Sequence, residues 1–310
     1  MSEIHKPGDE NDVSHMIRQV AAAEVPMEIM GSGSKHNIGR PSQTALIMST
    51  ENLRGVTLYE PTELVIAAMA GTPLATIETE LTKHNQQLAF EPIDLGNAVG
   101  SGGGTATIGG IIAANLSGSR RIYAGAARDH LLGIRAVNGR GEIFKSGGRV
   151  MKNVTGYDLC KTMAGSWGTL SVLTEITMKV LPKPEETRTL VIRGLTDEMA
   201  NEVLCAAMTT PYEVSGAVHL HQDMTARLRL TALDGIDSAI TALRIENISS
   251  SVDYRMTQLQ KRFAAYGEIV ELDNGASLAF WNKLQGLAFL EDGDAPVWRI
   301  STAPKAGHRV

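Results

Sequence analysis

The hydrophobic positions of the first 185 residues alternate between two spacings. Apolar residues spaced three and four apart, as on one face of a helix, occur over 11–24, and a second helical pattern runs from 74 to about 86. We expect Gly71 or Thr72 to cap the second helix, with Pro73 at its first position. Short apolar runs bounded by turn residues predict strands at 25–30, 44–48, 56–59, 63–70 and 169–181.

The middle of this region combines a hairpin with short helices. The apolar runs at 131–137 and 142–145 flank a turn sequence, Asn-Gly-Arg-Gly, that is typical of antiparallel strands. A helix is expected over 108–115, entered through two glycines, and another short helix is expected to end near 161–164.

A charged, proline-rich segment at 182–186 follows a complete strand and marks a domain boundary. The pattern beyond it is mixed α+β with few glycines. We predict two domains, 1–185 and 186–310, which agrees with the usual domain size. In the second domain we expect strands at 187–193 and 226–232 and helices at 196–208, 235–245 and 254–266.

Composition narrows the class of protein. The net charge is −5 and no basic run occurs, which argues against a nucleic-acid partner. Two cysteines cannot build a disulfide framework. The N-terminal residues are polar and no apolar run approaches the ~18 residues of a membrane helix, so we expect a cytoplasmic protein without direct membrane insertion.

Glycine is enriched to 31 of 310 residues, and much of the excess lies between 96 and 148. A first glycine-rich loop, Gly31-Ser32-Gly33-Ser34-Lys35, directly follows a predicted strand. Missing Cβ atoms let consecutive main-chain N–H groups turn toward one anion, which suits a pyrophosphate. A tight turn without a ligand is an equally good interpretation of this loop alone.

Two common nucleotide motifs are excluded. The sixth position of a GxGxxG pattern starting at Gly31 is His36, where a dinucleotide fingerprint needs glycine or alanine. No Gly-Lys-Ser/Thr tripeptide occurs, so the chain has no P-loop.

A second glycine-rich stretch is more informative, because seven of the fifteen residues from 96 to 110 are glycine. We expect the segment Thr107-Ile108-Gly109-Gly110 to present N–H groups at a helix start, where the helix dipole favours an anion. Asn115 and Ser117 add side-chain donors. A flexible linker is disfavoured, because the isoleucines that follow need burial.

A third segment surrounds Trp167, with small residues on both sides at 153–159 and 163–170. It either approaches a ring of a bound cofactor or forms a surface turn, and for Trp167 itself we favour the surface turn.

In this order, the segments resemble the PCMH-type FAD-binding domain of the vanillyl-alcohol-oxidase flavoproteins. The resemblance covers about residues 15–185 and is most similar to the FAD-binding subunits of bacterial glycolate oxidases, with RVMKNVTGYDL at 149–159 as its most specific part. The other matching segments are GSGSK at 31–35, YEPTELVIAAMAGTPLATIE at 59–78, ATIGGIIAANLSG at 106–118 and GAARDHLLGIRAVNGRGE at 125–142.

The resemblance implies an α+β protein: a PCMH-type FAD-binding domain of two α/β subdomains, followed by a smaller α+β cap on the substrate side. It also implies residues that hold FAD without a covalent bond, since no histidine matches an attachment site. These cofactor-binding residues are Gly31, Ser32, Gly33, Ser34, Lys35, Thr107, Gly109, Gly110, Asn115, Gly118 and Val172.

The implied function is oxidation of a small 2-hydroxy acid within a glycolate-oxidase-type complex. The implied partners are a second flavin subunit and an iron–sulfur subunit, and the complex is membrane-associated, if at all, through those partners. Two alternatives stay open: an autonomous FAD-dependent 2-hydroxy-acid dehydrogenase, and a scaffold subunit that has lost FAD.

Two departures from the family pattern stand out. Met30 precedes the first loop, where many relatives carry arginine. Relatives also continue well past the segment 296–300, so we expect the cap to be incomplete, with its roof missing or supplied by a partner.

The catalytic base is not identifiable from the sequence. His219 and His221 lie two residues apart on one face of a predicted strand, and Arg227, Arg229 and Arg299 are candidate carboxylate-binding cations. No third metal ligand is visible beside the histidine pair, so we predict no metal site.

Other polar residues receive simpler interpretations. Arg120, Arg121 and Arg128 either pair with phosphates or form ordinary salt bridges, for instance with Asp129. Cys160 is expected to be a small buried residue.

Overall fold

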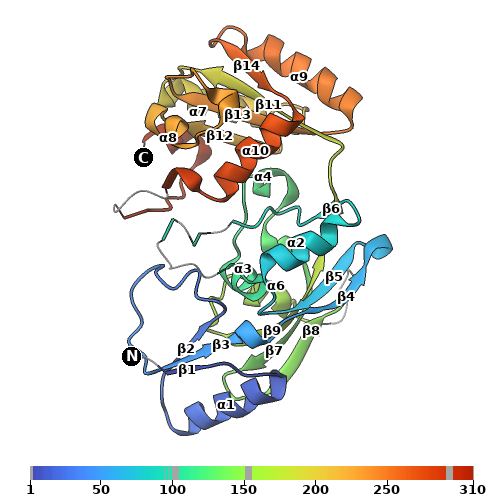
Figure 1. The fold of residues 1–310 in the computed structure, drawn as a ribbon, viewed down its shortest axis with the longest axis vertical. Helices are drawn as coiled ribbons and strands as arrows, with labels where there is room; N and C mark the ends of the chain where they lie inside the picture. Colours follow the sequence, from blue (N-terminus) through green and yellow to red (C-terminus); the bar gives the residue numbers. More distant parts are fainter. Residues whose placement is uncertain are drawn as a thin grey trace. The chain divides into compact units, whose positions relative to one another are not determined.

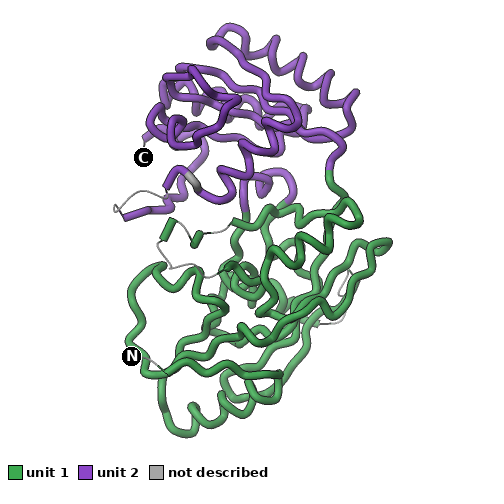
Figure 2. The backbone as a smooth tube through the Cα atoms, viewed as in Figure 1, with its two compact units in different colours: residues 1–117, 125–183 green, residues 118–124, 184–310 purple. Residues whose placement is uncertain are grey.

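The computed structural model describes residues 3–93, 95–96, 98–99, 105–150, 156–290 and 296–309. The chain divides into two compact units (Figure 2): the first comprises residues 1–117 and 125–183, and the second comprises 118–124 and 184–310. The division after 183 lies two residues before the boundary drawn from the sequence. Residues 118–124 belong to the second unit, whereas the sequence-based prediction included them in the first domain.

Two sheets form the first unit. A parallel sheet has the order β1 (Glu3–His5), β3 (Leu46–Ser49), β2 (Met27–Met30). An antiparallel sheet has the order β4 (Val56–Glu60), β5 (Val65–Met69), β9 (Ser171–Lys179), β7 (Leu131–Asn138), β8 (Ile143–Gly147). A short ribbon pairs β6 (Gln86–Gln87) with β10 (Leu181–Pro182).

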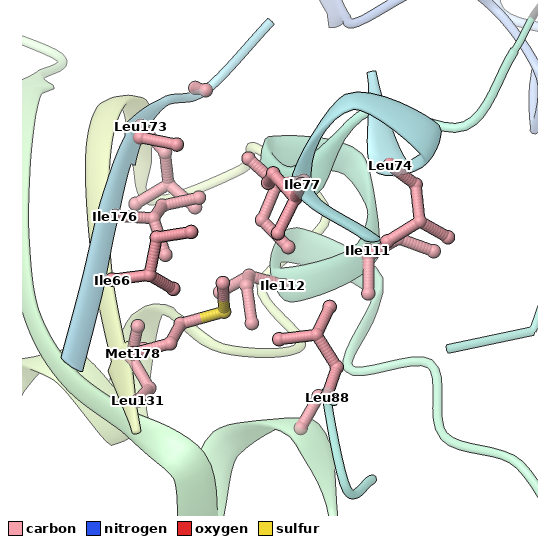
Figure 3. Packing of buried hydrophobic residues seen from close by; sticks show 14 of the residues in the cluster. Ile66, Leu74, Ile77, Leu88, Ile111, Ile112, Leu131, Leu173, Ile176 and Met178 are labelled. Carbon is pink, nitrogen blue, oxygen red and sulfur yellow. The ribbon is translucent and has the colours of Figure 1, made fainter. Parts of the chain in front are cut away.

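Helices cover both faces of the antiparallel sheet (Figure 1). Figure 3 shows one face, where Ile66, Leu173 and Ile176 point toward isoleucines of α2 (Leu74–Thr82) and α3 (Ile108–Ala114). On the other face, the alternate strand residues Val137 and Val172 pack against α1 (Glu10–Ala22). The alternation of side chains along β7 and β9 therefore builds two cores from one sheet. The remaining helices of this unit are α5 (Ala127–His130) and α6 (Leu159–Met163).

The second unit is a three-layer α+β structure. Its antiparallel sheet has the order β12 (Gly216–Leu220), β13 (Ile240–Asn247), β11 (Glu186–Arg193), β14 (Ile269–Leu272). One face packs against α7 (Asp197–Met208) and α9 (Ser249–Phe263), and the other against α8 (Gln222–Arg227) and α10 (Asn274–Gln285). Residues 118–124 add the short helix α4 (Arg121–Ala124) to this unit.

The predicted mixture of helices and strands is confirmed, and so are most elements of the first unit, including the hairpin of β7 and β8. Two predictions in the second unit are wrong. The helix predicted at 235–245 overlaps strand β13, and the strand predicted at 226–232 contains the end of α8 and a 3₁₀ turn. Strand β14 and helix α10 were not predicted. The strand predicted for the histidine pair is β12, but it holds only His219, because His221 lies beyond its end at the start of α8.

The predicted cap of α2 is also wrong. Pro73 itself occupies the N-cap position and makes no side-chain cap. The Thr72 hydroxyl donates instead to the carbonyl of Met69 at 2.6 Å, which holds the turn between β5 and α2. Within the described part of the chain, no helix combines the length and apolar character that a bilayer crossing requires.

Candidate cofactor-binding site

A cavity of about 520 Å³ lies in the first unit. Its walls come from β2, the loop that follows β2, one side of α3, and the turn and first residues of β9. This volume falls within the range of roughly 300–1,000 Å³ typical of small-molecule and cofactor sites. Eight of the eleven predicted cofactor-binding residues line it: Gly31, Ser32, Gly33, Ser34, Lys35, Thr107, Gly109 and Gly110.

The first glycine-rich loop offers main-chain donors to this cavity. The N–H groups of Ser32, Gly33 and Ser34 make no hydrogen bond to any described residue, although Ser34 is buried. Gly33 has φ +84°, a conformation that glycine adopts without strain and that turns successive amides to one side. Because unpaired buried donors are costly, this loop is built to be completed by an acceptor that the protein does not supply.

Lys35 adds a positive charge beside these amides. Its Nζ lies 3.1 Å from Ser34 Oγ and 3.4 Å from the position that a Cβ on Gly110 would occupy. The ammonium thus lies close to both glycine-rich segments. Arg40 also lines the cavity, so two cations face the same space, which favours an anionic ligand.

The two glycine-rich segments approach each other closely. A Cβ on Gly31 would lie 2.4 Å from Thr107 Oγ1, so only glycine permits the contact. Thr107 caps α3, with its hydroxyl accepting from the Gly110 N–H at 3.3 Å. The loop after β2 and the start of α3 are therefore held as one wall by missing side chains.

One expectation about α3 is wrong. The N–H groups of Ile108 and Gly109 are not exposed to an anion, because they donate to the carbonyls of Thr72 and Ala70 at 3.0 and 2.8 Å. A Cβ on Gly109 would lie 2.7 Å from the Ala70 oxygen. Gly109 is therefore required for packing of α3 against the end of β5. A Cβ on Gly110 would meet only side-chain atoms, Thr107 Oγ1 at 3.3 Å and Lys35 Nζ at 3.4 Å.

The other three predicted residues do not line the cavity. Asn115 ends α3 with φ 50°, and its Oδ1 accepts from the Arg128 N–H at 3.0 Å. Val172 packs with α1 on the far face of the sheet, while its neighbours Ser171 and Leu173 line the cavity. Gly118 belongs to the second unit.

Several lining residues were missed or undervalued. Trp167, which we interpreted as part of a surface turn, occupies a turn and is half exposed, but it also lines the cavity together with Gly168 and Thr169. Its φ of 54° is a signal visible only in the structure. The loop at 36–44 contributes Arg40 and Ser42, and nothing in its sequence distinguishes it from an ordinary connection.

Some predicted features lie outside the described residues, namely the glycines at 100 and 102–104 and the segment 151–155 of the most specific motif. Arg120 forms a buried ion pair with Glu246, and Arg128 lies 3.8 Å from Asp129, so both have structural partners. Cys160 is buried as predicted, and burial raises the pKa of its thiol.

These residues fit a cofactor that carries a diphosphate. Bare amides, two cations and glycines whose Cβ atoms would fill the wall all occur at one cavity, in an α/β unit of two sheets. A family model described as "FAD binding domain" matches residues 2–147. The fold and the cavity thus define an FAD-binding flavoprotein.

The chain belongs to the family of FAD-linked oxidoreductases that includes the glycolate oxidase subunit GlcE of Escherichia coli, to which it is 39% identical over 93% of its own length and 79% of that subunit. It is 30% identical to a D-lactate dehydrogenase of Archaeoglobus fulgidus over 61% of its length, which covers 41% of that enzyme.

A solved structure supports the fold. Alkyldihydroxyacetonephosphate synthase matches 93% of this chain with a TM-score of 0.71 and 17% sequence identity, and the match covers 55% of the synthase chain. At this identity the likeness shows the fold alone, and it confirms the predicted PCMH-type architecture.

Proposed function

We propose that this chain is the FAD-binding subunit of a glycolate-oxidase-type complex that oxidises a small 2-hydroxy acid. The observation that carries the proposal is the cavity in which the unpaired amides of Ser32, Gly33 and Ser34 lie beside Lys35. FAD bound there supplies the two-electron acceptor for oxidation of the hydroxy acid.

The residues of the chain have distinct tasks in this proposal. The loop at 31–35 binds the diphosphate through amide donors and the Lys35 ammonium, and Gly110 leaves room for it. Trp167 and Leu173 supply apolar surface for a ring system, which also excludes water from that part of the cavity. Asn115 and Val172 act indirectly, by fixing the end of α3 and the back of β9.

The substrate class and partners are inferred from relatives. Similar proteins are named glycolate oxidase subunits, D-lactate dehydrogenases and a D-2-hydroxyglutarate dehydrogenase, and all of these names refer to 2-hydroxy acids. Two of the names denote subunits, GlcE and GlcD, so we place a second flavin subunit beside this chain. An iron–sulfur subunit would accept the electrons, in the cytoplasm or at a membrane surface reached through partners.

The test begins with the purified chain. We expect the absorbance bands of a flavin and one FAD released on denaturation, with glycolate-dependent dye reduction only after the second flavin subunit and an iron–sulfur subunit are added. A folded, colourless chain that takes up no added FAD would refute the proposal and favour the scaffold alternative. Dye reduction by the isolated chain would favour the autonomous dehydrogenase.

A substitution locates the cofactor. Gly110→Val should lower FAD affinity at least tenfold, because its methyl groups would enter the cavity beside Thr107 Oγ1 and Lys35 Nζ, which would lie 3.3 and 3.4 Å from the new Cβ. Valine has a higher helix propensity than glycine, so α3 should persist. Gly275→Val in α10 is the matched control, since a Cβ there meets nothing closer than 3.6 Å. Equal FAD binding by both variants would place the cofactor elsewhere.

A further inference from the structure

Three potential metal ligands gather in the second unit. Asp197 is the first residue of α7, His219 lies in β12, and His221 directly precedes α8. One ligand atom from each lies within 4.8 Å of the other two. The two histidines are close in sequence, but the carboxylate reaches them only because α7 packs against β12.

The distances suit a small tetrahedral ion. Asp197 Oδ1 lies 3.3 Å from His219 Nε2 and 3.7 Å from His221 Nδ1. Zinc–ligand bonds of about 2.0–2.1 Å at tetrahedral angles separate neighbouring ligand atoms by roughly 3.3–3.4 Å. An octahedral ion with similar bonds would need about 3.0 Å. The His221 ring is 65% exposed, so it can rotate to complete the set without disturbing the core.

His219 is oriented by a buried neighbour. Its Nδ1 lies 2.9 Å from the hydroxyl of Thr241, which is fully buried in the adjacent strand β13. When Nδ1–H donates to this hydroxyl, Nε2 presents its lone pair toward Asp197. Support of the second ring nitrogen by a hydrogen bond is the usual arrangement for a metal-binding histidine.

The Nε2 atom of His219 faces the carboxylate of Asp197. It is buried and makes no hydrogen bond, although the Asp197 carboxylate is 3.3 Å away. Two lone-pair donors at this separation are complementary to a cation between them.

We propose that Asp197, His219 and His221 bind one Zn²⁺ ion, with the fourth coordination position open to water. Two imidazoles and one carboxylate are a ligand set that zinc accepts in proteins. The site differs from the prediction of no metal, which was made because a third ligand could not be seen beside the histidine pair. Asp197 precedes that pair by more than twenty residues, and only the fold brings it there.

The test is calorimetric titration of the full chain with ZnCl₂ after dialysis against EDTA and then against chelator-free buffer. We expect one saturable site. Asp197→Asn and His221→Gln should each weaken zinc binding at least tenfold, and both positions are at least half exposed, so the fold should survive. His15→Gln, an exposed histidine in α1, is the matched control and should bind as the unchanged chain does.

A second variant tests the orientation of His219. Thr241→Val keeps the shape of the buried residue but removes the acceptor for Nδ1–H, and it should weaken zinc binding by about 10–100-fold. Absence of a saturable site in the unchanged chain, or zinc binding that survives both Asp197→Asn and His221→Gln, would overturn the proposal. Either result leaves the FAD proposal intact, because all three ligands belong to the second unit and the cavity to the first.

Discussion

At the residue scale, the strongest electrostatic feature is a carboxylate between two arginines. Glu246 is 7% exposed, accepts two hydrogen bonds of 2.8 Å from Arg120, and lies 3.4 Å from Arg244. Arg244 is also buried and lies over the ring of Trp281 at 4.3 Å. Burial alone would raise the pKa of Glu246, but the Arg120 hydrogen bonds and both positive charges lower it to about 2.

This carboxylate predicts a pH-dependent stability. Its pKa rises from about 2 in the folded chain to an ordinary value of 4.5 on unfolding. Its contribution, roughly 3 kcal/mol, is therefore complete above pH 4.5 and is lost as the pH falls toward 2. Glu246→Gln should cost about 3–5 kcal/mol near pH 7, because two buried guanidinium groups lose their counter-charge.

Denaturant unfolding at several pH values checks this prediction. The difference between the unchanged chain and Glu246→Gln should shrink as the pH falls from 5 toward 2. Glu198→Gln, at an exposed position of α7, should change stability by less than about 0.5 kcal/mol at any pH. A constant difference across that range would contradict the assigned ionisation.

At the element scale, α3 has two adjacent glycines with different roles. Gly109→Ala should destabilise the chain by about 1–3 kcal/mol, because its Cβ would lie 2.7 Å from the Ala70 carbonyl, which also accepts the Gly109 N–H. Gly110→Ala should change stability by less than about 1 kcal/mol, because its Cβ would meet only side-chain atoms, Thr107 Oγ1 at 3.3 Å and Lys35 Nζ at 3.4 Å, and alanine favours the helix. Thermal melting of the two variants tests this difference. Equal losses of stability in both variants would contradict the packing role of Gly109.

The wrong helix prediction at 235–245 has a physical cause. Strand β13 is central in its sheet, so Leu243 and Ile245 enter one core while Ile240 and Ala242 enter the other. Because apolar residues point to both faces, the apolar positions of β13 show no period of two, and Thr241 and Arg244 are buried as well, so periodicity cannot distinguish this run from a buried helix. In the first unit the strands and helices were bounded by glycine and proline, and those boundaries made them predictable.

At the scale of the whole molecule, the two proposed sites belong to units with separate cores. We therefore expect their substitutions to act independently, as sites without shared partners do. Gly110→Val should lower FAD content while the zinc stoichiometry stays at one. His221→Gln should weaken zinc binding while the FAD content stays unchanged. Flavin absorbance and zinc titration on both variants measure this, and loss of both ligands in either variant would show that the units are energetically coupled.

The sequence by itself determined the cofactor-binding character of the first unit. Glycines at 31, 33, 109 and 110 are visible as residues, and their lack of Cβ atoms has the same consequence wherever the chain places them: close approach of main chain to a neighbour or a ligand. Eight predicted residues accordingly meet at one cavity.

The tertiary structure alone decided which main-chain amides stay unpaired. The N–H groups of Gly109 and Ile108 donate to the carbonyls of Ala70 and Thr72. The N–H groups of Ser32, Gly33 and Ser34 have no partner among the described residues. The tertiary structure also decided that Trp167 lines the cavity and that Asp197 joins His219 and His221. Each of these depends on contacts between residues distant in sequence, and residue type and local spacing carry no information about which distant segments will meet.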